Sequence, residues 1–116
     1  MGSSKECQES WDRFLAALKS GRIVALDRAA TSIGCNWVEN WLNPDQEGYD
    51  DRCAALAKGW AKKPVSFVSE NDGEIHASLS VPVWTKAFFY FGPRLFITFR
   101  RERDELKVDQ ISFSGD

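Results

Sequence analysis

The feature that most constrains the fold is the order of two patterns, helical periodicity in the first half of the chain and alternating strands in the second. Asn71-Asp72-Gly73 separates two alternating segments, and an Asp-Gly pair in that position is a strong signal for a tight β-hairpin turn. Between Val65 and Phe113 the chain has the pattern of strands joined by short turns. Helices followed by an antiparallel meander predict an α+β domain whose helices cover one face of the sheet.

Three helices are predicted before the strands. The first ends at Gly21 and presents an apolar face made of Cys7, Trp11, Phe14, Leu15 and Leu18. A second is expected to stop at Gly34, with an inward face made of Ile23, Leu26, Ala30 and Ile33. The third is expected from about Asp50 to Lys62, because acidic residues begin this segment, lysines end it, and Pro64 stops it.

Alternation also assigns the faces of the strands. Every second residue from Ile75 to Val83 is apolar, and the segment from Leu95 to Phe99 repeats that pattern. Phe88–Phe91 is aromatic at both parities, so one of its faces is expected to meet a ligand or a second subunit.

In the last strand the apolar phase slips by one residue near Asp109-Gln110, which predicts a β-bulge that bends the sheet. The expected fold is therefore α+β, with about three N-terminal helices on a bent, mostly antiparallel sheet of four or five strands. The alternative is a cystatin-like arrangement with one long helix across the sheet.

Length and charge bound the class of protein. The 116 residues make one domain, residues 1–116, and a formal net charge of −2 gives no general attraction to nucleic acid or to an anionic membrane. Arg94, Arg100, Arg101 and Arg103 are interspersed with acidic residues, which favours a charged hairpin tip over a nucleic-acid site. No apolar run approaches the ~20 residues of a membrane span, and the polar start lacks a secretory segment, so we expect a cytoplasmic protein.

Three cysteines leave an odd thiol, which argues against a disulfide framework. A zinc site made of Cys7, Cys35, Cys53 and the one histidine, His76, is formally possible but lacks the close spacing of such sites. We therefore expect no metal and no cofactor, with the cysteines acting as small apolar residues.

The string Phe14-Leu-Ala-Ala-Leu-Lys-Ser-Gly21, followed by Ile23-Val-Ala-Leu26, resembles the first two helices of the nuclear transport factor two-like superfamily. This superfamily includes ketosteroid isomerase and the polyketide cyclases. The ending Leu106-Lys-Val-Asp-Gln-Ile111 is similar to the last strand of that family, where an apolar pair precedes a bulge. The resemblance implies a cone-shaped fold with a pocket between helices and sheet, and dimers formed through the sheet.

The isomerase chemistry of that family does not carry over. The resemblance places an oxyanion-donating tyrosine at Phe14 and a general-base aspartate near Cys35 or Asn36, and none of these residues has the required group. Only Glu39 is near enough in sequence to replace the base. We therefore expect no steroid double-bond isomerisation at an enzymatic rate.

Three residues are candidates for other acid–base chemistry. His76 is the only side chain whose ordinary pKa suits proton transfer near neutral pH, although a hydrogen-bonded surface histidine is the more common case. Asp27 on the second helix and Glu39 are the carboxylate candidates, and a solvated helix carboxylate is the simpler interpretation of Asp27.

Aromatic residues make up 13% of the chain, more than a small core requires. The leading hypothesis is a small-molecule-binding domain without recognisable catalytic machinery. Its expected apolar pocket is lined by Phe14, Trp37, Trp41, Trp60 and Phe99. The alternatives are an isomerase, cyclase or hydrolase that uses the acid–base candidates, and a protein-docking or inhibitor module. We also expect a homodimer through the sheet face that bears Ser78, Ser80 and Trp84, with an aromatic from Phe88–Phe91 contributing.

Overall fold

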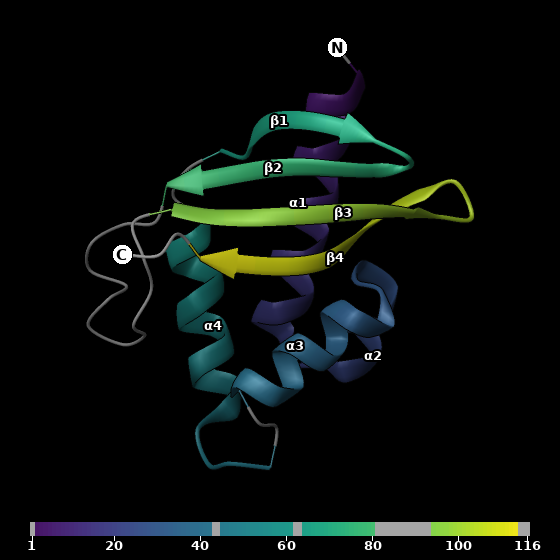
Figure 1. The fold of residues 1–116 in the computed structure, drawn as a ribbon. Helices are drawn as coiled ribbons and strands as arrows, with labels where there is room; N and C mark the ends of the chain where they lie inside the picture. The colour runs from purple at the N-terminus through teal and green to yellow at the C-terminus, as the bar shows by residue number, and fades with distance from the viewer. Residues whose placement is uncertain (1, 43–44, 62–63, 81–93, 114–116) are drawn as a thin grey trace.

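The computed structural model describes residues 2–42, 45–61, 64–80 and 94–113. Within these ranges the chain forms four helices followed by a four-stranded antiparallel sheet, which confirms the α+β class (Figure 1). The helices are α1 (Gly2–Ser20), α2 (Ile23–Ala29), α3 (Ser32–Leu42) and α4 (Tyr49–Trp60). The strands are β1 (Ser66–Asn71), β2 (Glu74–Ser80), β3 (Arg94–Glu102) and β4 (Glu105–Phe113), and they lie side by side in that order.

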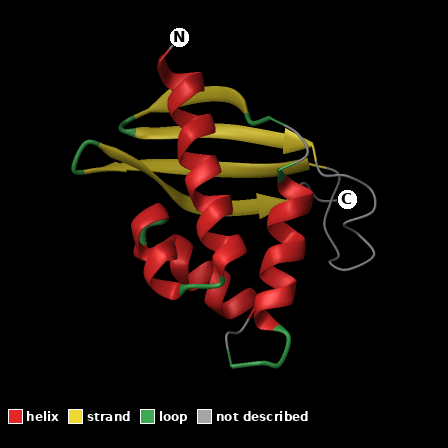
Figure 2. Cartoon of the chain, turned by 180° about the vertical axis from the view of Figure 1, so that it is seen from behind, coloured by secondary structure: helices red, strands yellow, loops and turns green. Residues whose placement is uncertain are grey.

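The helices lie on one face of the sheet. Figure 2 shows α1 running across the strands with α4 beside it, while α2 and α3 lie past the β4 edge. Among the described elements, none covers the opposite face of the sheet, which points toward the viewer in Figure 1. We call it the open face.

The core forms between α1, α4 and the inner face of the sheet. Trp11, Phe14 and Leu18 on α1 have no exposed surface, as the predicted apolar face requires. Gly21 ends this helix with a φ of 70°, a conformation that favours glycine, and its amide donates to the Leu18 carbonyl oxygen. From the sheet, Leu95, Ile97 and Phe99 of β3 contribute inward side chains that are at most 1% exposed. Strand alternation is confirmed there, since Phe96 between them is 42% exposed on the other side.

Two tight hairpin turns set the register of the sheet. Asn71 pairs with Glu74, and the two residues between them, Asp72 and Gly73, have φ values of 51° and 80°. Positive φ at both central residues is the conformation that matches the twist of a two-residue hairpin, so the predicted turn is confirmed. The β3–β4 hairpin uses the same conformation at Arg103 and Asp104, with φ values of 51° and 65°.

The predicted bulge in the last strand is also confirmed. Thr98 pairs with Gln110 and Phe99 pairs with Val108, which leaves Asp109 as the extra residue of β4. Because of this extra residue, Val108 and Asp109 are both buried although they are neighbours in the strand.

The predicted second helix was wrong in its extent. The chain leaves the helix at Ala30, which is extended, and begins α3 at Ser32, so Gly34 lies inside a helix and Ile33 is 51% exposed. The reason is tertiary, because the amide of Thr31 donates to the Val108 carbonyl oxygen (2.9 Å) and Ala30 forms a parallel bridge with Val108. This contact with the sheet edge outweighs the local helical pattern.

The third predicted helix corresponds to α4, displaced by one or two residues at its ends. No helix in the described ranges has the length and apolar character needed to cross a membrane. Trp84 and Phe88–Phe91, which were assigned to the dimer interface, lie outside the described residues.

Candidate ligand-binding groove

A groove of about 690 Å³ lies between α1, α2 and the start of β4. We call it the α1–α2–β4 groove. Its described lining residues are Arg13, Ala16, Ala17, Ser20, Arg22, Ala25, Asp27, Arg28, Ala29, Glu105 and Lys107. The volume lies within the usual range for small-molecule sites in proteins, roughly 300–1,000 Å³.

Alanines supply the apolar part of this groove. Ala16 and Ala17 come from α1, and Ala25 and Ala29 come from the facing helix α2. Alanine is a good helix former that projects only a methyl group, so two adjacent helices can keep their regular geometry and still leave space between them. The same residues therefore stabilise the helices and line the hollow.

The polar part of the groove is mainly cationic. Arg13, Arg22, Arg28 and Lys107 are four cationic lining residues, against two carboxylates, Asp27 and Glu105. Each guanidinium carries five N–H donors in a fixed planar fork, the geometry that matches carboxylate, sulfate and phosphate groups.

These cations differ in how far they are already engaged. Arg13 Nη2 donates to the Leu106 carbonyl oxygen (3.2 Å), and Lys107 Nζ lies 3.5 Å from Glu102 Oε1. Within the described part of the chain, the guanidinium groups of Arg22 and Arg28 make no hydrogen bond or ion pair. Two of the four cationic groups thus keep all their side-chain donors for a ligand.

Asp27 is the one acid–base candidate from the sequence that lies in this groove. Its Oδ1 accepts a hydrogen bond from the Cys35 thiol, with 3.3 Å between Sγ and Oδ1. Burial, together with this hydrogen bond and the nearby Asp27 charge, raises the pKa of the Cys35 thiol to about 12. Cys35 is therefore a protonated donor at neutral pH and not a thiolate nucleophile.

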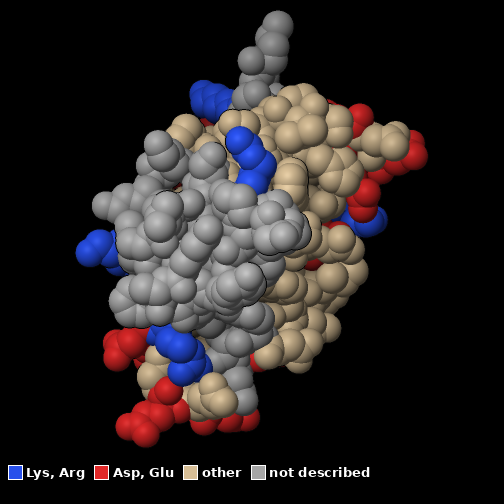
Figure 3. Space-filling model, turned by 60° about the vertical axis from the view of Figure 1, so that its left-hand side comes forward, with Lys and Arg blue, Asp and Glu red and all other residues tan. Residues whose placement is uncertain are grey.

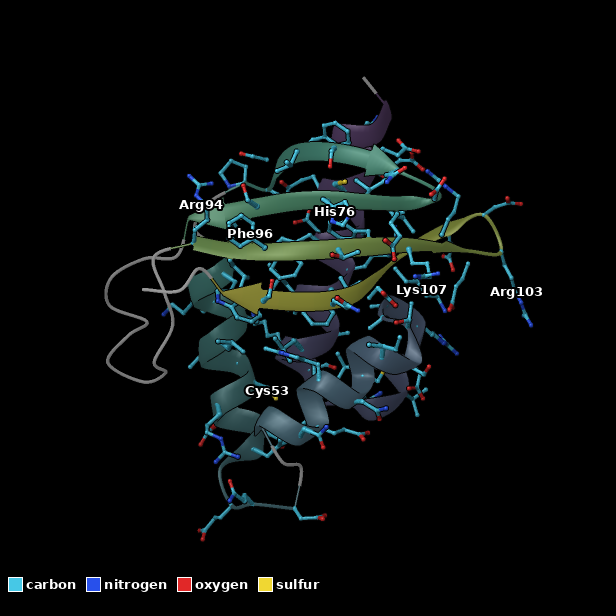
Figure 4. All side chains as sticks on the ribbon, in the orientation of Figure 1. Cys53, His76, Arg94, Phe96, Arg103 and Lys107 are labelled. Atoms are coloured by element: carbon cyan, nitrogen blue, oxygen red, sulfur yellow. The ribbon has the colours of Figure 1, made fainter. Side chains whose placement is uncertain are left out.

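The other two acid–base candidates lie elsewhere. Glu39 is half-buried on α3, and His76 is on β2, on the open face, where its Nδ1 lies 3.3 Å from Thr98 Oγ1 (Figure 4). Neither residue is among those that line the α1–α2–β4 groove. The structure thus places the three candidates on three elements and does not gather them into one acid–base site.

Most of the aromatic residues expected to line a pocket fill the core. Phe14, Trp60 and Phe99 have no exposed surface, and Trp37 is partly buried against them. Trp11 links the cluster, with ring centroids 5.2 Å from Phe14 and 5.6 Å from Trp60. The side chain of Trp41 lies outside the described set.

The rings of this cluster are not among the described residues that line the α1–α2–β4 groove. The reason is that the rings stack on one another at distances typical of core aromatic pairs, roughly 4.5–7 Å. The Trp37 and Trp60 rings extend the cluster, with centroids 6.3 Å apart.

A second groove, of about 660 Å³, lies on the other flank of α1, against α4. We call it the α1–α4 groove. Its described lining residues are Leu15, Ala16, Lys19, Ala54, Ala55, Ala57, Lys58 and Ala61. It repeats the composition of the first groove, with alanines between cationic side chains, and its described lining has no carboxylate.

The groove residues were not singled out in the sequence. Arg13, Ala16 and Ser20 lie on the side of α1 opposite its apolar face, a position usually interpreted as solvated surface. The available signal was composition, because alanines and arginines with few carboxylates recur in residues 13–29. That signal does not reveal that α2 folds back against α1.

No cluster of three or more histidine, cysteine, aspartate or glutamate side chains suitable for a metal ion occurs among the described residues. The cysteines lie on three different helices, all buried. Charges on the face shown in Figure 3 are mixed. Figure 3 shows lysine and arginine interspersed with aspartate and glutamate among the atoms it colours, without one continuous patch of either sign.

No protein-family model matches the chain, and neither a curated protein nor a solved structure shows detectable similarity to it.

Proposed function

We propose that this protein is a small-molecule-binding domain that holds an organic anion with an apolar part in the α1–α2–β4 groove. One observation carries the proposal: the groove combines four alanines with four cationic side chains, two of which have no partner in the described part of the chain. Charge complementarity selects an acid group, and the methyl groups select an apolar body.

Binding accounts for this groove better than catalysis does. The carboxylate of Asp27 accepts the Cys35 thiol hydrogen, and Lys107 Nζ lies 3.5 Å from the main-chain carbonyl oxygen of Asp27. The Cys35 thiol is not ionised at neutral pH, because its pKa is raised to about 12. Neither Glu39 nor His76 lines the groove, so no second acid–base candidate from the sequence lies beside Asp27 there.

Titration with anilinonaphthalene sulfonate tests the proposal, because this probe joins an apolar ring system to a sulfonate and fluoresces when it is bound. We expect saturable binding that weakens with added salt. Arg28→Glu should weaken it about tenfold or more, since repulsion replaces attraction and tenfold corresponds to about 1.4 kcal/mol.

Lys5→Glu makes the same change of charge on α1, at an exposed position that lines neither groove. The Lys5→Glu variant should bind anilinonaphthalene sulfonate with the same affinity as the unaltered chain. Near-UV circular dichroism excludes a loosened core as the cause of probe binding. Equal losses in the Arg28 and Lys5 variants would contradict the proposed site.

The enzyme alternative rests on Asp27, the candidate that lies in the groove. Turnover that depends on pH and is lost in Asp27→Asn would favour it. Steroid isomerisation is a separate expectation. We expect no turnover above background with a β,γ-unsaturated ketosteroid, because Phe14 offers no donor and loss of one oxyanion donor typically costs about 10²–10³ in rate. Turnover abolished by Glu39→Gln would show that expectation to be wrong.

We also propose, from the resemblance in the sequence, a relationship to the nuclear transport factor two-like superfamily and a homodimer through the open face. The order of helices and meander, the helix end at Gly21 and the bulge at Asp109 support the first part. The exposed ring of Phe96 and the polar side chains of His76 and Thr98 on the open face support the second. A monomer mass in light scattering at tens of micromolar would contradict the dimer.

A further inference from the structure

The two grooves have one residue in common. Ala16 lines both the α1–α2–β4 groove and the α1–α4 groove, so the two hollows meet across the outer ridge of α1. On that ridge its neighbours three and four residues away are Asp12, Arg13, Lys19 and Ser20. A methyl group between larger side chains is the lowest point of the ridge.

The hollow beyond the ridge is apolar. Leu15 and the alanines of α4 line it, and Ala54, Ala57 and Ala61 fall on one side of that helix at spacings of three and four residues. Lys19 and Lys58 are its described polar residues, and both have long aliphatic stems that can cover an apolar guest while the ammonium groups stay in water.

We propose that the ligand is a long-chain alkyl anion, an inference that rests on the proposed function. The acid head group lies in the α1–α2–β4 groove near Arg22 and Arg28. The alkyl tail crosses α1 over Ala16 and lies in the α1–α4 groove. This assignment uses the cations on one side, the apolar lining on the other and the shared alanine between them.

The alkyl tail supplies affinity that the head group alone lacks. Each methylene that is fully removed from water strengthens binding up to about fourfold, and a methylene in an open groove contributes less. Affinity should therefore rise with chain length only while the tail still finds apolar surface, which extends past Ala16 if the two grooves act as one site.

The test compares octanoate with tetradecanoate, each below its micelle concentration, by isothermal titration calorimetry on the whole chain. Tetradecanoate should bind more than about tenfold tighter than octanoate. Arg28→Glu should weaken both ligands, because both use the head-group site.

Ala54→Phe fills the α1–α4 groove without touching the other one. It should reduce the affinity for tetradecanoate to about that for octanoate and leave octanoate binding unchanged. Ala55→Leu is a milder change at the same groove and repeats the test if the phenylalanine variant does not fold, as judged by circular dichroism.

The possible results separate the two proposals. Octanoate binding that depends on Arg28, with no gain for tetradecanoate, overturns the tail site and leaves the head-group site standing. Tetradecanoate binding that is the same in Ala54→Phe and Ala55→Leu as in the unaltered chain also overturns the tail site. Absence of binding by both carboxylates overturns the tail site together with the proposed function.

Discussion

The two edge strands of the sheet, β1 and β4, each contain a β-bulge, but the extra residue is exposed in one and buried in the other. At the β4 edge the extra residue is Asp109, which is 1% exposed, whereas at the β1 edge it is Val68, which is 57% exposed. Every residue of β1 is exposed. Edge strands present unpaired backbone groups that proteins either cover or disrupt. Here the β4 edge is covered, and the β1 edge contains a bulge whose extra residue is exposed.

The β4 edge is covered by the junction of α2 and α3. Thr31 Oγ1 donates to Asp109 Oδ1 (2.6 Å) and accepts from the Gly34 amide (3.3 Å), so one hydroxyl joins the bulge to the start of α3. Near the start of β4, Ser10 Oγ from α1 donates to the Leu106 carbonyl oxygen (2.8 Å). The β1 side has the hydrogen bond from the Val65 amide to Gln8 Oε1 (2.9 Å), just before the strand. A bulge therefore does not by itself destabilise a sheet edge, because its effect on stability depends on what the extra residue contacts.

The largest effect on this difference should come from Gly34→Val. A Cβ at this position would lie 2.5 Å from the Val108 carbonyl oxygen, a backbone atom that cannot move without breaking the bridge to Ala30. We expect a loss of about 3 kcal/mol in the free energy of unfolding, measured by urea denaturation. Asn36→Val puts the same side chain at an exposed position of α3 and should cost about 0.5 kcal/mol or less. Similar losses in the two variants would mean that the contact between Gly34 and Val108 is not tight.

Alanine at each bulge residue compares the two edges directly. Asp109→Ala should cost about 2 kcal/mol, because the buried Thr31 hydroxyl loses its hydrogen-bond acceptor. Val68→Ala should change stability by less than about 0.5 kcal/mol, since the side chain is on the surface. Thermal or urea denaturation of both variants measures the free energy of unfolding. Equal losses in the two variants would show that the two bulges contribute equally to stability.

Thiol alkylation measures local opening at the two edges. Cys7 lies on α1 near β1, and Cys35 lies on α3 beside β4. Burial raises the pKa of both thiols, that of Cys7 to about 11 and that of Cys35 to about 12, so neither reacts as a thiolate at pH values near neutrality. We expect iodoacetamide to label Cys7 several-fold faster than Cys35 in the native protein, because fewer contacts hold the β1 side.

The same pKa shifts set the sign of an alkaline effect. In the unfolded chain a thiol ionises at about pH 8.5, which is a lower pH than in the folded state. The burial of these thiols therefore leaves stability unchanged below that pH and reduces it as the pH rises toward about 11 or 12.

The labelling experiment is read out by peptide mass spectrometry. Faster labelling of Cys35 than of Cys7 would contradict the prediction that the β1 edge opens more readily than the β4 edge.

The smallest effect should come from the ion pair between Glu6 and Arg101, with Nη1 2.9 Å from Oε2. The hydrogen bond from Arg101 lowers the pKa of Glu6, so the pair stabilises the fold above the ordinary glutamate pKa and is lost as the pH falls through the lowered value. Both side chains are partly exposed to water, so Glu6→Gln should cost less than about 1 kcal/mol at neutral pH. The difference between variant and parent should disappear at about pH 3. A difference that persists in acid would mean that Glu6 acts through packing.

Local patterns in the sequence determined much of the fold. The apolar face of residues 7–18, the Asp72-Gly73 turn and the phase slip at Asp109 were all predicted correctly, because each depends on residues that are neighbours along the chain or across one turn. The helix break at Ala30–Thr31 was not predicted. It depends on Val108, a residue distant in sequence whose carbonyl oxygen binds the Thr31 amide.

The candidate site divides in the same way. Asp27 was named from the sequence, but its companions Arg13, Arg28 and Lys107 come from three elements that meet only after α2 folds against α1 and β4. For the aromatic residues, the composition showed that their content is high but not where their rings lie. Only the packing of Trp11 against Phe14 and Trp60 decided that these rings fill the core and that alanines and arginines line the grooves. Periodicity reports which side of an element is apolar, whereas the burial of a given side depends on which other element covers it, and that is a property of the tertiary structure.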